Sequence, residues 1–200
     1  MKRKVYPRII GIAGHVGSGK TMLARHFQRE HGYTLYDCSD SLCLLYEELH
    51  GWVTNELPGT LAWREAWSEH KRNKDVRAAL QKMGHWTATH FGPAALLYPA
   101  FVHADIKGPV VIAGIRRMAE AAAILEHPAG LMLGIERPGY RAINDHATES
   151  EVDEVLATLG EVTGGACVCM NDEGPEDVTL WAEDILVEYS AAAGDCVGCE

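Results

Sequence analysis

Short apolar runs alternate with longer amphipathic stretches along this chain. The runs have the length and composition of buried strands and cover residues 8–13, 33–36, 110–113, 130–135 and 166–170. Between most of them, apolar residues recur three and four positions apart, as Met22, Leu23 and Phe27 do, and this spacing indicates helices. Strands that alternate with helices predict one α/β domain, with a doubly wound, five-stranded parallel sheet.

The helices are not distributed evenly between the strands. We expect them at 19–31, 40–50, 60–70, 75–90, 93–104, 116–126, 150–159 and 176–189. No strand interrupts 40–103, so this part is expected to form a helical lobe above a core of 1–39 and 104–190, at the carboxyl ends of the strands. Residues 136–149 contain Pro138-Gly139 and predict a lid, and 191–200 predict a frayed tail.

Residues 14–21 fit the phosphate-binding pattern G-x-x-x-x-G-K-[ST], and they join the first apolar run to the first amphipathic stretch. In such a P-loop the backbone N–H groups bind phosphate oxygens, the lysine adds positive charge and the final hydroxyl ligates Mg²⁺. We therefore expect ATP and Mg²⁺ here, with Lys20 catalytic and Thr21 the magnesium ligand. The ATP-binding residues of the loop are then Gly14, His15, Val16, Gly17, Ser18, Gly19, Lys20 and Thr21.

The charge and hydropathy of the chain argue against binding to nucleic acid or insertion into a membrane. The formal net charge of −10 opposes binding along a nucleic-acid backbone, and 47% hydrophobic residues suit a packed core. No apolar run approaches the ~20 residues that a membrane-spanning helix needs. We expect a cytoplasmic protein that binds small-molecule nucleotides, and the sequence leaves open whether it is a monomer or a homodimer.

The six cysteines allow two interpretations. A cytoplasmic setting argues against disulfides. Four of the thiols could supply a zinc site, namely Cys167, Cys169, Cys196 and Cys199. Ordinary buried and tail thiols are the interpretation we favour, because the first pair lies in an apolar strand.

The helical lobe offers side chains for a second substrate. Arg77 and Gln81 are four residues apart on one helix face, so both can reach the same ligand. Four tryptophans offer an aromatic wall for a nucleobase, with Trp86 the substrate-binding candidate, while core packing is the alternative for each of Trp52, Trp63, Trp67 and Trp86.

Behind the P-loop, four segments resemble the deoxynucleoside monophosphate kinases of bacteriophages, within the nucleotide kinase superfamily. Residues 77–84 resemble the family's R-x-x-L-Q-x-x-G, and 110–116 resemble its third strand and D-V-R. Residues 137–139 with 146–149 are similar to its R-P-G…H-x-S-E lid, and 171–174 to its N-x-G adenine loop. The order of these segments behind a P-loop is more specific than any one of them.

The resemblance implies ATP-dependent phosphorylation of deoxynucleoside monophosphates to diphosphates. It assigns Arg116, or its neighbour Arg117, to the acceptor phosphate, and the lid residues Arg137 and Arg141 to the reacting phosphates. Arg116 and Arg137 are then catalytic. The resemblance also assigns Asn171 and Gly174 to the ATP adenine.

One departure from the family concerns an acid. The family's D-V-R is Gly114-Ile115-Arg116 here, so another carboxylate must replace the missing one. Asp37 and Asp40 both follow the short second strand. We favour Asp40 as the substrate or base contact and keep Asp37 as the second choice, with helix capping the alternative for either.

Two other functions remain open. A dephospho-coenzyme A type kinase, or another small-molecule kinase, would have the same loop, lid and adenine segment. A nucleotide-dependent switch or ATPase would share the P-loop, but it needs no acceptor pocket, so the long helical insertion argues against it.

Overall fold

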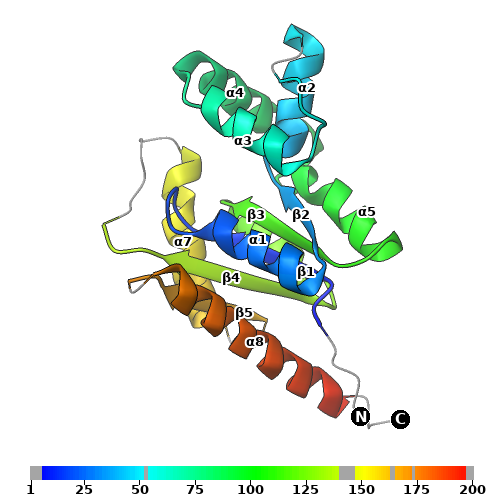
Figure 1. Cartoon of the computed structure of the whole chain (residues 1–200), viewed down its shortest axis with the longest axis vertical. Coiled ribbons are helices and arrows are strands. Elements are labelled where there is room, and N and C mark those ends of the chain that lie inside the picture. The colour runs from blue at the N-terminus through cyan, green and yellow to red at the C-terminus, as the bar shows by residue number, and fades with distance from the viewer. Residues whose placement is uncertain (1–5, 52–53, 140–146, 163–164, 173, 197–200) are drawn as a thin grey trace.

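A parallel sheet forms the centre of the molecule (Figure 1). The computed structural model describes residues 6–51, 54–139, 147–162, 165–172 and 174–196. The strands are β1 (Ile9–Ala13), β2 (Thr34–Asp37), β3 (Val110–Ile115), β4 (Gly130–Glu136) and β5 (Ala166–Met170). They lie in the order β2-β3-β1-β4-β5 and every pair is parallel, which confirms the predicted five-stranded α/β fold.

Helices cover both faces of this sheet. On one face α1 (Lys20–His31) and α8 (Pro175–Cys196) lie side by side, as Figure 1 shows. On the other face lie α5 (Tyr98–Ile106), α6 (Met118–Leu125) and α7 (Ala147–Glu161). Successive residues of β1 therefore face opposite layers, with Ile9 packed in one hydrophobic cluster and Ile10 in the other. Burial on both faces explains why the strands read as continuous apolar runs.

Three further helices form a separate layer beyond the end of β2 (Figure 1). These are α2 (Asp40–His50), α3 (Leu61–His70) and α4 (Lys74–Phe91), and a short 3-10 helix, η1 (Ala95–Leu97), leads from them to α5. We refer to α2, α3 and α4 as the helical lobe. The lobe has its own hydrophobic core, made of Leu42, Cys43, Trp63, Trp67 and Leu80.

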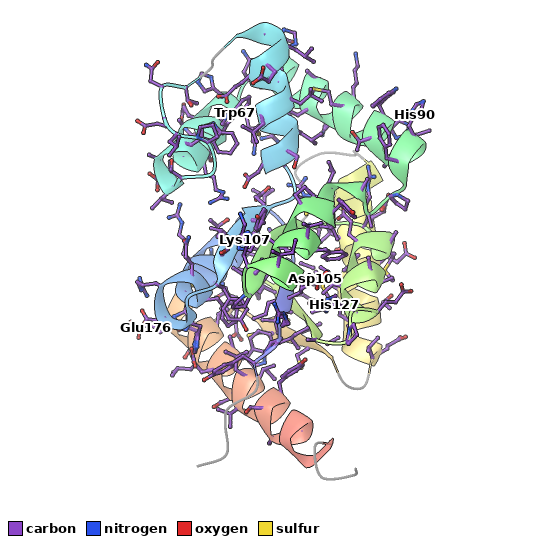
Figure 2. The ribbon with its side chains drawn as sticks, turned by 90° about the vertical axis from the view of Figure 1, so that its right-hand side faces the viewer. Trp67, His90, Asp105, Lys107, His127 and Glu176 are labelled. Carbon is purple, nitrogen blue, oxygen red and sulfur yellow. The ribbon has the colours of Figure 1, made fainter. Side chains whose placement is uncertain are left out.

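Two tryptophans of the lobe are structural. Trp63 and Trp67 are buried, and their indole N–H groups donate to the carboxylate of buried Glu47 at 3.2 and 3.0 Å. Figure 2 shows Trp67 inside the helical layer. Core packing is therefore the correct interpretation for this pair.

Several boundaries differ from the predicted ones. The predicted helix 93–104 is a 3-10 turn followed by α5, and α7 begins at Ala147, inside the predicted lid. The frayed tail is wrong for residues 191–196, because α8 continues to Cys196. Three consecutive alanines, 191–193, have high helix propensity and extend the helix. None of the helices in the described ranges is long and apolar enough to cross a membrane.

Candidate functional site

The P-loop connects the central strand β1 to α1 through three glycines with left-handed backbone angles. Gly14, Gly17 and Gly19 have φ values of 146°, 84° and 111°. A Cβ added at Gly14 would lie 2.4 Å from the carbonyl oxygen of Ile135, so only glycine fits there. The backbone N–H groups of this tight turn lie at the N-terminus of α1, where the helix dipole also favours a bound anion.

The side chains of the loop fit a bound phosphate group. Lys20 is buried, and its Nζ donates to the carbonyl oxygen of His15 at 2.5 Å. Ser18 is fully buried, and its hydroxyl oxygen has no hydrogen-bond partner among the described residues. A buried hydroxyl without a partner is costly unless a ligand satisfies it. Thr21, directly after Lys20, is exposed at the first turn of α1, where a magnesium ion beside bound phosphates can reach its hydroxyl.

Side chains from two other elements hold the loop in place. The buried amide of Asn171, just after β5, donates from Nδ2 to the carbonyl oxygen of Ser18 at 2.7 Å. His15 lies 2.7 Å from the carboxylate of Asp153 on α7, measured from Nε2 to Oδ1. The predicted contact of Asn171 with the adenine stays a prediction, and the structure adds that its amide holds the loop. Gly174, the other predicted adenine contact, follows with a φ of 136°.

One predicted lid arginine reaches the P-loop. Arg137, one residue after β4, donates from Nη1 to the carbonyl oxygen of Gly17 at 3.1 Å. Its guanidinium therefore lies beside the phosphate-binding turn. Arg141, the second lid arginine, lies outside the described residues.

A cavity of about 200 Å³ adjoins the P-loop at the carboxyl ends of β2 and β3 and extends under the helical lobe. It begins at Val16 of the loop and collects side chains from well-separated parts of the sequence. Its walls are formed by Val16, Asp37, Cys38, Ser39, Leu42, Lys71, Arg77, Leu80, Gln81, Gly84, Leu96, Gly114, Arg116, Arg117 and Glu120. The cavity, which we refer to as the acceptor cavity, brings together the predicted residues Arg77, Gln81 and Arg116.

Asp37 provides a carboxylate in this cavity. It accepts hydrogen bonds from the N–H and the hydroxyl of Ser39, at 2.8 and 2.6 Å. Burial alone raises the pKa of Asp37, but the positive charge of Lys71, the two bonds from Ser39 and the charge of Arg116 outweigh it, so the pKa lies below its usual range. The group is therefore ionised at neutral pH.

Asp37 lies beside Gly114, the position at which the bacteriophage kinases that the sequence resembles have an aspartate. Gly114, at the end of β3, has a φ of 81°, and a Cβ built there would lie 3.5 Å from Oδ2 of Asp37. A carboxylate from β2 thus occupies the space beside the position where the family places an acid on β3. An aspartate at 114 would bring two like charges into contact.

Asp40, which the sequence favoured, is not among the residues that line the cavity. Its Oδ2 accepts from Nη2 and Nε of Arg64, at 2.6 and 2.9 Å, and Arg64 also donates to the carbonyl oxygen of Leu35. Burial raises the pKa of Asp40 in spite of these bonds. Its position is that of a structural ion pair between α2 and α3, so the structure favours Asp37 as the carboxylate of the site.

The aromatic wall is not formed by the described tryptophans. Trp86 is 52% exposed and its ring stacks on His90, with the ring centroids 4.5 Å apart. Figure 2 shows His90 at the outer end of α4. Trp63 and Trp67 are in the lobe core, and Trp52 lies outside the described residues. The apolar wall of the cavity is aliphatic instead, and consists of Leu42, Leu80 and Leu96.

Two charged residues of the cavity were missed in the sequence. Glu120 is buried and accepts from the backbone N–H groups of Arg116 and Arg117, at 3.0 and 3.2 Å, which fixes the turn that carries both arginines. A glutamate three residues after a helix start is a capping signal that could have identified it. Lys71 follows α3 and donates from Nζ to the hydroxyl of Ser39 at 2.6 Å, and no local pattern marks it.

The four cysteines that could supply a zinc site are only partly described. Cys167 and Cys169 are half-buried on the same face of β5, where they pack against α1 and α8, as strand alternation predicts. Cys196 ends α8, and Cys199 lies outside the described residues. The thiol interpretation therefore stays a prediction.

Comparison with known proteins supports the fold. No protein-family model matches the chain, and no curated protein does either. Among solved structures, it is similar to a shikimate kinase from Acinetobacter baumannii in complex with shikimate, with a TM-score of 0.50, 16% identity and coverage of 92% of this chain and 95% of that chain. A dephospho-CoA kinase from Campylobacter jejuni gives a TM-score of 0.48 and 11% identity, over 92% of this chain and 98% of that chain.

The sequence identities to these two solved structures are only 16% and 11%. At such identities a structural likeness concerns the fold and not the substrate. The similarity to bacteriophage deoxynucleoside monophosphate kinases therefore stays a resemblance of motifs. The chain has the α/β fold that it shares with the shikimate kinase over 92% of its length.

Proposed function

We propose that this chain is an ATP-dependent kinase that transfers the γ-phosphoryl group to a small anionic acceptor in the acceptor cavity. The observation that carries the proposal is the continuity of this cavity with the P-loop at Val16, together with its four cationic side chains, Lys71, Arg77, Arg116 and Arg117. Transfer between two anions requires alignment and positive charge more than covalent help. A P-loop beside a cationic cavity supplies both.

On the ATP side, the proposed roles follow from the loop geometry. The N–H groups of residues 14–19 and the ammonium of Lys20 hold the phosphates, and Arg137 beside Gly17 adds charge near the γ-phosphate. Thr21 would hold Mg²⁺, which neutralises phosphate charge when bound. A pure ATPase would need a water at the reaction centre, and the charged cavity beside the loop favours an acceptor instead.

For the acceptor we propose a deoxynucleoside monophosphate. Arg77 and Gln81 project from one face of α4 into the cavity, and Arg116 approaches it from the end of β3. A guanidinium fork matches the oxygens of a phosphate, and the Gln81 amide can pair with the edge of a base. The aliphatic wall suits the flat face of any base, so several bases should be accepted.

A second acceptor class is supported by Asp37. An ionised carboxylate in the cavity can take the proton of an alcohol that attacks the γ-phosphate. A monophosphate acceptor has no such proton to lose at neutral pH. The second candidate is therefore an anionic alcohol, as in a dephospho-coenzyme A type kinase or another small-molecule kinase.

One assay separates these functions. ADP release is followed with ATP alone, with each of the four deoxynucleoside monophosphates, and with dephospho-coenzyme A, shikimate or gluconate. We expect slow release with ATP alone and a steep rise with at least one monophosphate, with the diphosphate product identified by chromatography. A nucleoside without its 5′ phosphate should not stimulate.

The remaining outcomes are equally informative. Stimulation by an anionic alcohol alone would select the second class and contradict the first. If no acceptor stimulates release and ATP is still hydrolysed, the switch or ATPase takes the place of the kinase. Lys20→Ala serves as the blank for contaminating activity.

A further inference from the structure

Two histidines and a glutamate converge on the sheet face opposite α6 and α7. His26 and His31 belong to α1, and Glu183 belongs to α8. The Nε2 atoms of both rings approach the same oxygen, Oε1 of Glu183, at 2.7 and 2.6 Å. The three ligand-type atoms lie within 4.8 Å of one another, and this is the one such cluster of three metal-binding side chains in the part of the chain that the structure describes.

The convergence results from how the two helices pack. His26 and His31 lie on the side of α1 that contacts α8, and Gly32, with a φ of 70°, ends α1 directly after His31. The ring centroids are 5.9 Å apart with the ring planes tilted by 66°, so the rings meet edge to face rather than stack. Both histidine side chains are only 15% exposed, while that of Glu183 is 39% exposed.

The ion pairs of Glu183 are also consistent with a cation site. Among the described residues, its ion-pair partners are these two histidines, and no lysine or arginine pairs with it.

We propose that His26, His31 and Glu183 bind a divalent transition-metal ion, with Zn²⁺ the ion that best matches two imidazoles and one carboxylate. Zinc bonds of ~2.0–2.1 Å in a tetrahedron place ligand atoms roughly 3.3 Å apart. The half-exposed Glu183 side chain needs to withdraw by less than about 1 Å from each nitrogen to admit the ion. Solvent can occupy the fourth position on the exposed side.

Such a site is structural, because it is remote from the phosphates. Along α1 the eleven steps from Lys20 to His31 span about 16 Å. The metal would tie the C-terminal end of the helix that carries the P-loop to α8. It is therefore independent of the kinase proposal, and its test does not depend on activity.

The test uses the full chain after removal of metal with a chelator. We expect one Co²⁺ per chain with micromolar or tighter affinity, weak visible d–d bands, and no intense near-ultraviolet thiolate band. Zn²⁺ should displace Co²⁺ and raise the melting temperature. Glu183→Gln and His31→Gln should each weaken binding by about tenfold or more, because each removes one of three ligands.

Control variants separate this site from others. His90→Gln removes an exposed histidine on α4 and should leave the affinity unchanged. Cys196→Ser combined with Cys199→Ser should also leave it unchanged. Circular dichroism of each variant checks that the chain is folded. The proposal fails if the unmodified chain binds neither ion, if thiolate bands appear, or if the folded His31→Gln variant binds as well as the unmodified chain.

Discussion

The P-loop and the acceptor cavity adjoin each other, but they are built in different ways. The P-loop is one continuous segment whose proposed binding groups are mainly backbone N–H groups, in a turn formed by glycines. The acceptor cavity takes its side chains from the P-loop, β2, α2, α3, α4, η1, β3 and α6 or the turns next to them. The first is specified locally by sequence, and the second exists only when distant elements pack together.

This difference predicts how the two regions respond to substitution. In the P-loop, a side chain that acts on the reacting phosphates should affect the maximal rate. In the acceptor cavity, a side chain that holds the second substrate should affect its Michaelis constant. Variants that remove one group from each region test this division.

The largest effect is expected for Lys20→Ala. Removing a buried cation from the phosphate site should lower kcat by about 10²-fold or more. Thermal melting should change little, because the loop backbone is held by glycine geometry and by Asn171. Lys74→Ala, at the exposed start of α4, is the matched control and should retain full turnover. Turnover near normal in Lys20→Ala would contradict the phosphate role of this region.

Arg116→Ala should show the opposite pattern. Loss of a charged hydrogen bond costs roughly 1.5–3 kcal/mol, so kcat/KM for the acceptor should fall by about 10- to 100-fold. The Michaelis constant for ATP should change much less, since Arg116 lines the acceptor cavity. Steady-state kinetics with each substrate varied in turn provide the measurement. Arg72→Ala, which breaks an exposed pair with Glu69, is the control. Equal losses for both substrates would indicate general disruption.

Asp37→Asn should change how the stability of the chain depends on pH. The pKa of Asp37 lies below that of the unfolded chain, about 3.9, because Lys71, Ser39 and Arg116 outweigh burial. The stability that the ionised group contributes is therefore complete above about pH 4 and is lost as the pH falls through the lower, folded-state pKa. Denaturant unfolding between pH 7 and pH 2.5 should show a steeper acid loss for the unmodified chain than for Asp37→Asn. Parallel curves would exclude this contribution.

The same variant separates the two acceptor classes. For an alcohol acceptor, loss of a general base should lower kcat by about 10²-fold or more. For a monophosphate acceptor, Asp37→Asn should mainly change the acceptor Michaelis constant. A large kcat loss with a deoxynucleoside monophosphate would contradict this distinction.

Asn171→Ala should have a moderate effect on the nucleotide side. It leaves the carbonyl oxygen of Ser18 without its buried donor, at a cost of about 1 kcal/mol. We expect the Michaelis constant for ATP to rise about fivefold and the melting temperature to fall by roughly 2–4 °C. Nucleotide titration and thermal melting measure the two effects. A change in the acceptor constant alone would mean that the amide does not support the loop.

The smallest effect is expected for Trp86→Ala. Its ring is half-exposed, stacks on His90 and does not line the cavity. Surface substitutions usually change free energies by less than about 0.5 kcal/mol, or about twofold. The acceptor Michaelis constant should therefore stay within about twofold of normal. A tenfold increase in the acceptor Michaelis constant would indicate that Trp86 contacts the substrate after all.

The same contrast governs what the sequence could predict. The strands and the P-loop could be predicted because each depends on a local pattern of residues. Arg77, Gln81 and Arg116 also belong to local patterns, and in the structure all three line the cavity beside the P-loop. The choice between Asp37 and Asp40 depends on Arg64, which lies on another helix, so no local pattern contains it. Lys71 likewise reaches the cavity only through the packing of α3.

The sequence also could not show which tryptophans of the lobe are buried in its core. Trp63, Trp67 and Trp86 all occur in helices of one lobe, and from the sequence Trp86 is the substrate-binding candidate, with core packing the alternative for each of them. Glu47 distinguishes them in the structure, because a buried carboxylate needs donors and two indoles provide them. Trp86 lies on the outer side of α4 and pairs with His90.

The two tryptophans bound to Glu47, Trp63 and Trp67, also allow the state of the lobe to be followed by fluorescence. Trp63 and Trp67 are shielded from solvent, whereas Trp86 is open to it. In a chain whose other tryptophans, Trp52 and Trp181, are replaced by phenylalanine, a soluble quencher such as iodide should therefore extinguish part of the emission and leave a blue-shifted remainder. If the lobe moves as a rigid unit when nucleotide binds, that protected emission keeps its wavelength. Local melting of the lobe would expose both indoles and shift the protected emission to the red. The chain thus carries its own optical probe for distinguishing motion of the lobe from its unfolding.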